Sequence, residues 1–209
     1  VITLFNLRRI WITDKRNNHT GTEEWLSERF GLFDKYCFSS VSQQTNKDFI
    51  WLCLFTDQTP GKYVEKIKEY EAKCPQMVAC YFSDEDMSNW IERLRSIIKG
   101  YMDGDEEYII TTNIDTDDLI HKNMVNRIQE EFKDGNREGV YSMLYGYQYF
   151  PFNGLLLKMR YPHSHFLSLV EKYTPEFKTL KCESHGRIRK YFNNIDYKVL
   201  KPVGGINLV

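Results

Sequence analysis

Apolar runs alternate with segments of helical periodicity along the first two thirds of the chain. Short, almost entirely apolar runs predict strands at 1–7, 49–55, 77–82 and 108–114. The second of them, FIWLCLF, contains no polar residue, which is typical of a strand buried on both faces of a parallel sheet. Apolar residues at helical spacing predict helices at 22–35, 60–73, 83–99 and 119–132. Thr22, Pro60 and either Ser83 or Ser88 suit the starts of the first three helices.

The last third of the chain has a different pattern, rich in Tyr, Phe and Leu. Val140–Met159 predicts two or three strands, with a tight hairpin turn at Asn153-Gly154. Helices are expected at Ser164–Lys172 and Gly186–Phe192, and a late strand at Tyr197–Leu200. Together the elements indicate the α/β class, with a Rossmann-like, mainly parallel sheet, helices on both faces and a mixed C-terminal half.

Composition and charge narrow the choice of function. The 209 residues are 42% hydrophobic, which suits a single domain over 1–209. The formal net charge is -1, without the basic clusters that a nucleic-acid-binding protein needs. The 5 cysteines contain no C-x-x-C pair, which argues against a disulfide framework or a structural zinc site and favours the reducing cytoplasm. No apolar run has the roughly 20 residues of a membrane span, so at most we expect association with the inner face of the membrane.

Three carboxylates, Asp115, Asp117 and Asp118, directly follow a predicted buried strand. Because like charges this close repel one another, a cation or hydrogen-bond donors must compensate them. A hard divalent ion with oxygen ligands is one solution, and it would hold a diphosphate at the end of the sheet. The alternative is a helix start, in which Asp118 caps the next helix. Asp57 ends an earlier strand in a similar way, either to contact a nucleobase or as an ordinary turn residue.

The segment 111–125, TTNIDTDDLIHKNMV, resembles the D-x-D segment of GT-A glycosyltransferases, in particular that of a bacterial family of rhamnosyltransferases. Other segments resemble that family in the same order: Trp25-Leu-x-x-Arg29 with Phe33, Ser39-Ser40-Val-x-x-Gln44-Thr45, Phe49-Ile-Trp51-Leu and Ser168-Leu-Val-Glu171. The resemblance covers most of the chain. The chain departs from the family pattern where Asn113-Ile114 replaces an Arg before the first acid, and where Leu4 replaces the Arg of a Thr-Arg-Phe-Asn segment.

This resemblance implies a GT-A-like fold and a metal-dependent glycosyltransferase of the hexosyltransferase type. The enzyme would move a sugar, rhamnose by the family's name, from a nucleoside-diphosphate sugar to a saccharide or glycan acceptor. The half 1–118 would bind the nucleotide, and the half 119–209 would face the acceptor. Mn²⁺ or Mg²⁺ would be held by Asp115, Asp117 and His185.

Three further residues are candidates for donor binding and catalysis. The diphosphate sugar would contact Arg8 and Arg187, besides Asp57 and Asp115, because guanidinium groups match phosphate oxygens. Glu183 is a candidate base for the acceptor hydroxyl. For Arg187, Glu183 and His185 the alternative is a solvated surface side chain.

Two other functions compete with this interpretation. A metal-dependent phosphohydrolase also gathers acids at strand ends, although it generally has more clustered His and Asp. An inactive sugar-nucleotide-binding module would keep the fold without the chemistry. A nucleotidyltransferase is disfavoured, because the segment Asn6-Leu-Arg-Arg has no glycine-rich phosphate loop after the first strand.

Overall fold

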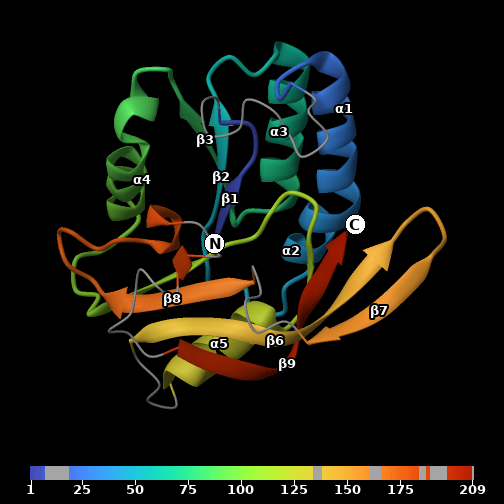
Figure 1. Ribbon diagram of the computed structural model, residues 1–209. Coiled ribbons are helices and arrows are strands. Elements are labelled where there is room, and N and C mark those ends of the chain that lie inside the picture. Colours follow the sequence, from blue (N-terminus) through green and yellow to red (C-terminus); the bar gives the residue numbers. More distant parts are fainter. Residues whose placement is uncertain (8–18, 134–137, 161–165, 184–186, 189–196, 209) are drawn as a thin grey trace.

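The computed structural model describes residues 1–7, 19–133, 138–160, 166–183, 187–188 and 197–208. A three-stranded sheet has the order β1-β2-β3, and a six-stranded sheet has the order β4-β8-β6-β9-β5, with β7 paired to β6 (Figure 1). The strands are β1 Ile2–Leu4, β2 Trp51–Thr56, β3 Met77–Phe82, β4 Tyr108–Thr112, β5 Leu119–Ile120, β6 Gly139–Phe150, β7 Leu155–Arg160, β8 Leu167–Lys172 and β9 Tyr197–Leu208. The α-helices are α1 Glu23–Leu32, α2 Ser39–Ser42, α3 Gly61–Lys73, α4 Trp90–Lys99 and α5 Met124–Lys133.

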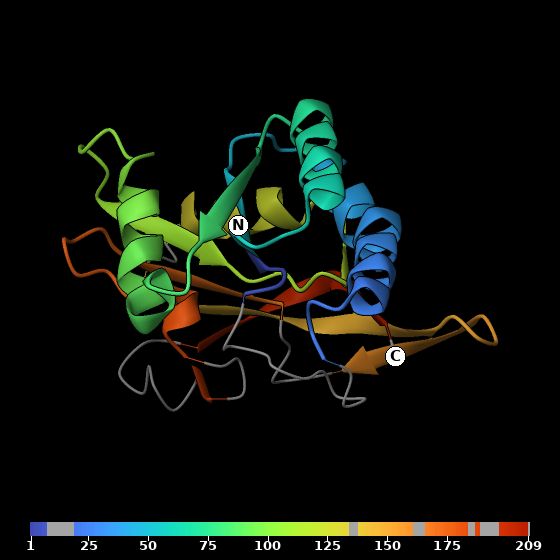
Figure 2. The same cartoon turned by 90° about the horizontal axis from the view of Figure 1, so that it is seen from above.

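The first sheet is parallel and is covered by helices on both faces (Figures 1 and 2). Side chains of β2 alternate between the two faces, as a strand requires. Trp51, Cys53 and Phe55 pack in the cluster that contains α1 and α3, whereas Leu52 and Leu54 pack with α4. The apolar run in the sequence therefore marks a strand buried on both sides, as predicted.

An aromatic cluster forms the centre of the core on the α1 side. Phe33 is 0% exposed, and its ring centroid lies 5.2 Å from Phe5, 5.6 Å from Trp51 and 5.3 Å from Tyr70. Phe33 opens a π-helical segment, Phe33–Phe38, through which the chain runs from α1 into α2. The helical path from α1 to α2 is thus fixed by aromatic packing against β1 and β2.

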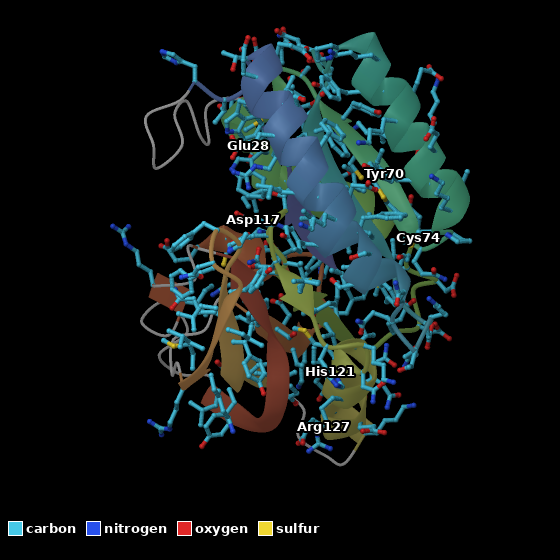
Figure 3. The ribbon with its side chains drawn as sticks, turned by 90° about the vertical axis from the view of Figure 1, so that its right-hand side faces the viewer. Glu28, Tyr70, Cys74, Asp117, His121 and Arg127 are labelled. Atoms are coloured by element: carbon cyan, nitrogen blue, oxygen red, sulfur yellow. The ribbon has the colours of Figure 1, made fainter. Side chains whose placement is uncertain are left out.

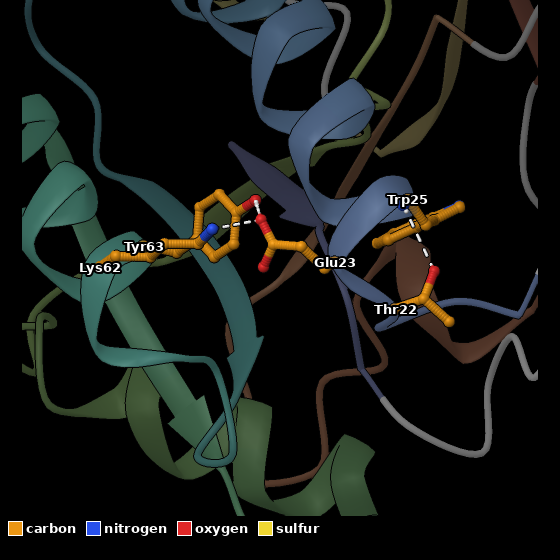
Figure 4. Close-up of polar contacts among 5 residues, drawn as sticks. All are labelled: Thr22, Glu23, Trp25, Lys62 and Tyr63. Atoms are coloured by element: carbon orange, nitrogen blue, oxygen red, sulfur yellow. Dashed lines mark hydrogen bonds and ion pairs between the residues drawn. The ribbon is translucent and has the colours of Figure 1, made fainter.

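Helix α1 is fixed at its N-terminus by side-chain contacts (Figure 4). The predicted cap Thr22 accepts a hydrogen bond from the backbone N–H of Trp25 at 3.3 Å. The Glu23 carboxylate accepts hydrogen bonds from Tyr63 at 2.9 Å and from Lys62, both on α3. These contacts hold α1 beside α3 and so set the direction in which α1 runs toward the acidic segment.

The two sheets meet between β1 and β4. Ile2 of β1 forms a parallel bridge with Asn113, and the N–H of Ile114 donates to the carbonyl of Ile2 at 3.2 Å. From β1 the chain order therefore proceeds to β2 on one side and to β4 on the other. Ligands of open α/β sheets bind outside the carboxyl ends of the strands at such a reversal. Asn6 and Asp115 both lie just beyond those ends.

Strands replace parts of two predicted helices, although α5 confirms the helix prediction over 124–132. Where a helix was predicted over 119–132, β5 pairs with β9 before α5 begins at Met124, so Asp118 does not cap a helix. The predicted helix Ser164–Lys172 is wrong for 167–172, because β8 lies between β4 and β6 and pairs with both. Of the predicted helix Gly186–Phe192, only residues 187–188 are described, and they are helical. The late strand is confirmed and is longer than predicted.

Several local predictions are confirmed. Helix α3 follows Pro60, and the Asn153-Gly154 turn connects β6 and β7, with Gly154 in the left-handed region at φ 71°. Cys37, Cys53, Cys74 and Cys80 are buried thiols outside any disulfide. No helix in the described ranges has the length and apolar character needed to cross a bilayer.

We expect Phe33→Ala to lower the free energy of unfolding by about 4 kcal/mol, because it leaves a cavity among three packed rings. Phe152→Ala is the matched control, since Phe152 is 83% exposed and its loss should change stability by less than about 0.5 kcal/mol. Urea denaturation of both variants measures the difference. Equal free energies of unfolding for the two variants would show that Phe33 contributes no more to stability than an exposed side chain.

Candidate active site

The acidic segment after β4 alternates between exposed and buried side chains. Asp115 and Asp117 are partly exposed, whereas Thr116 and Asp118 are 2% and 3% exposed. The backbone N–H of Asp118 donates to the carbonyl of Asp115 at 3.3 Å, which closes a turn. Because of this alternation, Asp115 and Asp117 are the carboxylates that a ligand can reach.

The buried thiol of Cys37 lies within the electrostatic influence of the acidic segment. Burial raises the pKa of the Cys37 thiol well above its usual value, and the charges of the three acids raise it further.

Arg29 of α1 compensates part of this negative charge. Its guanidinium Nη1 lies 3.1 Å from Asp117 Oδ2 and donates to Thr116 Oγ1 at 3.0 Å. The guanidinium also lies 5.2 Å from the Trp25 ring centroid, a cation–π contact one helical turn away. The Arg29 side chain is 16% exposed, so its charge acts where solvent screens it weakly. Figure 3 shows Asp117 at the junction between α1 and the mixed sheet.

Lys181 is the second cation near the acids. It follows them in the sequence, whereas Arg29 precedes them. Its ammonium donates to Asn113 Oδ1, and the Asn113 amide donates to Asp115 Oδ1 at 3.4 Å. Burial lowers the pKa of Lys181 from 10.5 to about 8, and the nearby charge of Asp115 opposes that shift. Two cations, Arg29 and Lys181, therefore flank the acidic segment.

The backbone that presents Lys181 is held in a strained conformation. Thr179 has φ 65°, and it is the single non-glycine residue with positive φ among the described residues. Such a conformation costs on the order of 1–3 kcal/mol for a β-branched residue. Glu171 offsets this cost, because its carboxylate accepts from the N–H groups of Lys178 and Thr179 at 2.8 Å each. The N–H of Leu180 donates to Thr111 on β4 at 2.9 Å.

The segment after the acids is anchored by residues that follow the π-helical segment. Ser40 Oγ accepts from the N–H of Ile120 at 3.2 Å. The Gln44 amide donates to the carbonyl of His121 at 3.0 Å and accepts from the N–H of Val125 at 3.1 Å. Gln44 is 1% exposed, so these bonds are shielded from water. The acidic segment is therefore fixed at both of its ends.

The carboxyl end of β2 is the second part of the candidate site. Asn6, after β1, accepts from the N–H of Thr56 at 3.2 Å and donates to Thr59 Oγ1 at 3.2 Å. The N–H of Asp57 donates to the carbonyl of Phe82 at 2.9 Å, and its side chain is exposed. Asn6 thus fixes the turn that presents Asp57 at the end of the parallel sheet.

The structure places only part of the predicted site. Asp115 and Asp117 lie together, and Asp57 lies at the end of β2, which β1 separates from the strand that carries the acids. Glu183 is partly exposed, two residues beyond Lys181. Arg187 is exposed and forms no ion pair within the described part of the chain. The other two predicted site residues, Arg8 and His185, lie outside the described residues.

Two carboxylates of the described structure, Asp115 and Asp117, could hold a metal ion. Among residues with assigned positions, no three His, Cys, Asp or Glu side chains gather into a metal-binding group. Two carboxylates are nevertheless enough for Mg²⁺ when substrate phosphates supply further oxygens. Asp115 and Asp117 have the right chemistry and exposure for that arrangement. A cavity of about 270 Å³ is separate from them, because it is lined by His121, Asn123, Met143 and residues of α5.

Sequence reasoning missed Arg29, Lys181 and Asn6 as site residues. Each of them was within a segment that drew attention for other reasons: Arg29 in the Trp25-Leu-x-x-Arg29 motif, Asn6 after the first strand, and Lys181 near His185. Each of the three contacts a residue far away in the sequence. Arg29 contacts Thr116 across 87 residues, Lys181 contacts Asn113 across 68, and Asn6 contacts Thr59 across 53. The resemblance of the Trp25-Leu-x-x-Arg29 motif to the family was a usable signal for Arg29, whereas no local signal pointed to Lys181.

A family model described as "Putative rhamnosyl transferase" matches residues 11–171, well over half of the chain. The chain belongs to this rhamnosyl transferase family. The match includes the acidic segment, Arg29 and Glu171, and it confirms the resemblance seen in the sequence. No curated protein sequence matches the chain.

Solved structures with the same fold include the Staphylococcus aureus protein TarS. Its 1–349 fragment in complex with UDP has a TM-score of 0.55 at 12% identity, covering 100% of this chain and 59% of that chain. The same fragment in complex with UDP-GlcNAc has a TM-score of 0.52 at 14% identity, covering 85% and 56%. At this identity the likeness shows the fold, which is GT-A-like. The rhamnosyl transferase family member spans little more than half of the TarS fragment.

Proposed function

We propose that this protein is a metal-dependent glycosyltransferase that uses a nucleoside-diphosphate sugar as donor and a saccharide or glycan as acceptor. The observation that carries the proposal is the pair of accessible carboxylates, Asp115 and Asp117, at the strand-order reversal beside β1 and β4. Family membership and the GT-A-like fold support it. The TarS fragment of the same fold is known in complex with UDP and UDP-GlcNAc.

The donor would lie across the carboxyl ends of β1, β2 and β4. Its nucleobase would contact the turn at Asp57, which Asn6 holds in place. Asp115 would face the ribose or the metal, and Asp117 would bind Mn²⁺ or Mg²⁺. When bound, the metal would neutralise negative charge on the diphosphate. Arg29 and Lys181 flank these acids and would add positive charge on the protein side.

In the reaction, the bond between the sugar's anomeric carbon and the diphosphate oxygen breaks, and a bond from that carbon to the acceptor oxygen forms. The nucleoside diphosphate leaves with the bonding electron pair, so cations beside it lower the barrier. The acceptor's hydroxyl proton passes to a base, for which Glu183 is the candidate. His185 as a third metal ligand, and Arg8 and Arg187 as donor contacts, stay predictions.

The donor sugar is rhamnose in the simplest extension of the family description. We also propose a cytoplasmic location, at the inner face of the membrane. The buried thiols Cys37 and Cys53 are compatible with a reducing compartment.

The proposal is tested by the products released from UDP- and dTDP-sugars in the presence of Mn²⁺ and candidate glycans. A glycosyltransferase releases the nucleoside diphosphate and no inorganic phosphate. Release of inorganic phosphate would instead favour the phosphohydrolase. Tight nucleotide binding without turnover of any sugar would favour an inactive binding module.

Asp117→Asn should weaken Mn²⁺-dependent binding of UDP or dTDP about tenfold or more, since it removes one ligand charge. Asp105→Asn is the matched control, because Asp105 is an exposed carboxylate in the loop before β4. Calorimetry with and without Mn²⁺ measures the change, and circular dichroism checks the fold. Unchanged metal-dependent affinity in Asp117→Asn would remove Asp117 from the metal site.

Nucleotide affinity should fall as pH rises through about 8, where Lys181 loses its proton. The terminal phosphate is already dianionic there, since its second pKa is about 6. Above this pH the nucleotide affinity should fall by about tenfold for each pH unit, because binding then requires protonation of the lysine.

Lys181→Arg keeps its charge throughout this range and should abolish the pH dependence, whereas Lys181→Met should bind weakly at every pH. UDP titrations in Mg²⁺ from neutral to alkaline pH compare the three proteins. The same alkaline fall in wild type and Lys181→Arg would show that another group is responsible.

A further inference from the structure

Exposed apolar side chains are concentrated in the hairpin of β6 and β7. Of the six large hydrophobic residues that are exposed in the described part of the chain, four lie here: Phe152 at 83%, Leu155 at 44%, Leu156 at 47% and Leu157 at 40%. Every residue from 151 to 158 is exposed. Figures 1 and 2 both show the hairpin extending away from the rest of the molecule. Exposed apolar groups gathered in one place mark an interaction site.

Both faces of this hairpin are apolar. Leu156 is paired with Tyr149 on one face, whereas Leu155 is paired with Phe150 on the other. A strand that covers a protein core or a flat partner is apolar on one face and polar on the other. A hairpin that is apolar on both faces is instead suited to apolar surroundings on both sides.

Along the hairpin, apolar side chains at the tip give way to basic and tyrosine side chains nearer the base. Beyond the leucines, β7 carries Lys158 and Arg160, which are paired with Tyr147 and Tyr145 of β6. Lys158 Nζ lies 5.7 Å from the Tyr145 ring centroid. Tyrosine together with Lys or Arg is typical of side chains at a membrane–water interface, where the ring and the aliphatic stem stay apolar and the end reaches water.

The strands of the hairpin and the segments next to them in sequence carry fixed charge of one sign. Residues 139–170 include no Asp or Glu, although the chain has 29 acids in its 209 residues. Their fixed charges are Lys158 and Arg160. This surface is complementary to anionic lipid headgroups. A symmetric contact between two copies would place the same positive charges against each other, which disfavours a second copy as the occupant.

We propose that the β6–β7 hairpin inserts its tip, Phe152 and Leu155–Leu157, into the interface of an anionic lipid bilayer, with Lys158 and Arg160 at the headgroups. This peripheral contact requires no helix that spans the membrane. It does not depend on the proposed transfer reaction, because it concerns only surface residues of the hairpin. It would hold the enzyme at a membrane surface in one orientation.

The test is sedimentation of the full chain with vesicles of phosphatidylcholine, with and without phosphatidylglycerol. Wild type should bind the anionic vesicles, and Phe152→Ser with Leu156→Ser should bind about 100-fold more weakly, from roughly tenfold for each side chain. Lys158→Gln with Arg160→Gln should lose the preference for phosphatidylglycerol, by roughly fivefold for each charge. Added salt should weaken wild-type binding in the same way.

The matched control is Ile50→Ser with Tyr101→Ser, which removes the two other large hydrophobic residues that are exposed in the described ranges and should leave vesicle binding unchanged. Failure of wild type to bind anionic vesicles would overturn the proposal, and so would an equal loss in the control. Self-association in sedimentation velocity that the Phe152 and Leu156 changes abolish, without vesicle binding, would assign the hairpin to a second copy instead. None of these outcomes depends on sugar transfer.

Discussion

Negative charge concentrated at one strand end is the constraint on which the rest of the site depends. Asp115, Asp117 and Asp118 follow β4 where the strand order reverses, and one of the three is buried. Carboxylates this close are stable only with compensating cations or donors. Arg29 from α1 and Lys181 from the segment after β8 supply them from two sides. A divalent ion and a diphosphate would enter a site in which much of this compensation already exists.

Three of the segments that resemble the family hold the acidic segment, whereas Phe49-Ile-Trp51-Leu contributes to the core around β2. Arg29 binds it directly, Ser40 and Gln44 anchor its C-terminal side, and Glu171 fixes the strained backbone that presents Lys181. None of these four must touch a substrate to be needed. A motif in this family therefore reports the support of the site as much as its chemistry, and residues far apart in sequence share it because they meet around one loop.

The mixed sheet connects this site to the hairpin. Strand β8 lies between β4, which leads into the acids, and β6, which continues into the exposed hairpin. The hydrophobic cluster that contains Phe33 also includes Tyr141 and Met143 of β6 and Val170 of β8, so one core joins the two sheets. A membrane contact at the hairpin would orient the carboxyl ends of the parallel strands relative to the lipid surface without any moving part.

The sequence by itself determined the elements whose signals are local. The apolar run of β2, Pro60 before α3 and the Asn153-Gly154 turn each act within a few residues, so their structures followed from pattern. It also located the acids at a strand end. The tertiary structure alone decided that 119–120 and 167–172 are strands, because both acquire their hydrogen bonds from distant partners. An apolar run buried between two strands has no period that distinguishes it from a buried helix. The same reason applies to Lys181, since a hydrogen bond to a residue 68 positions away has no local signature.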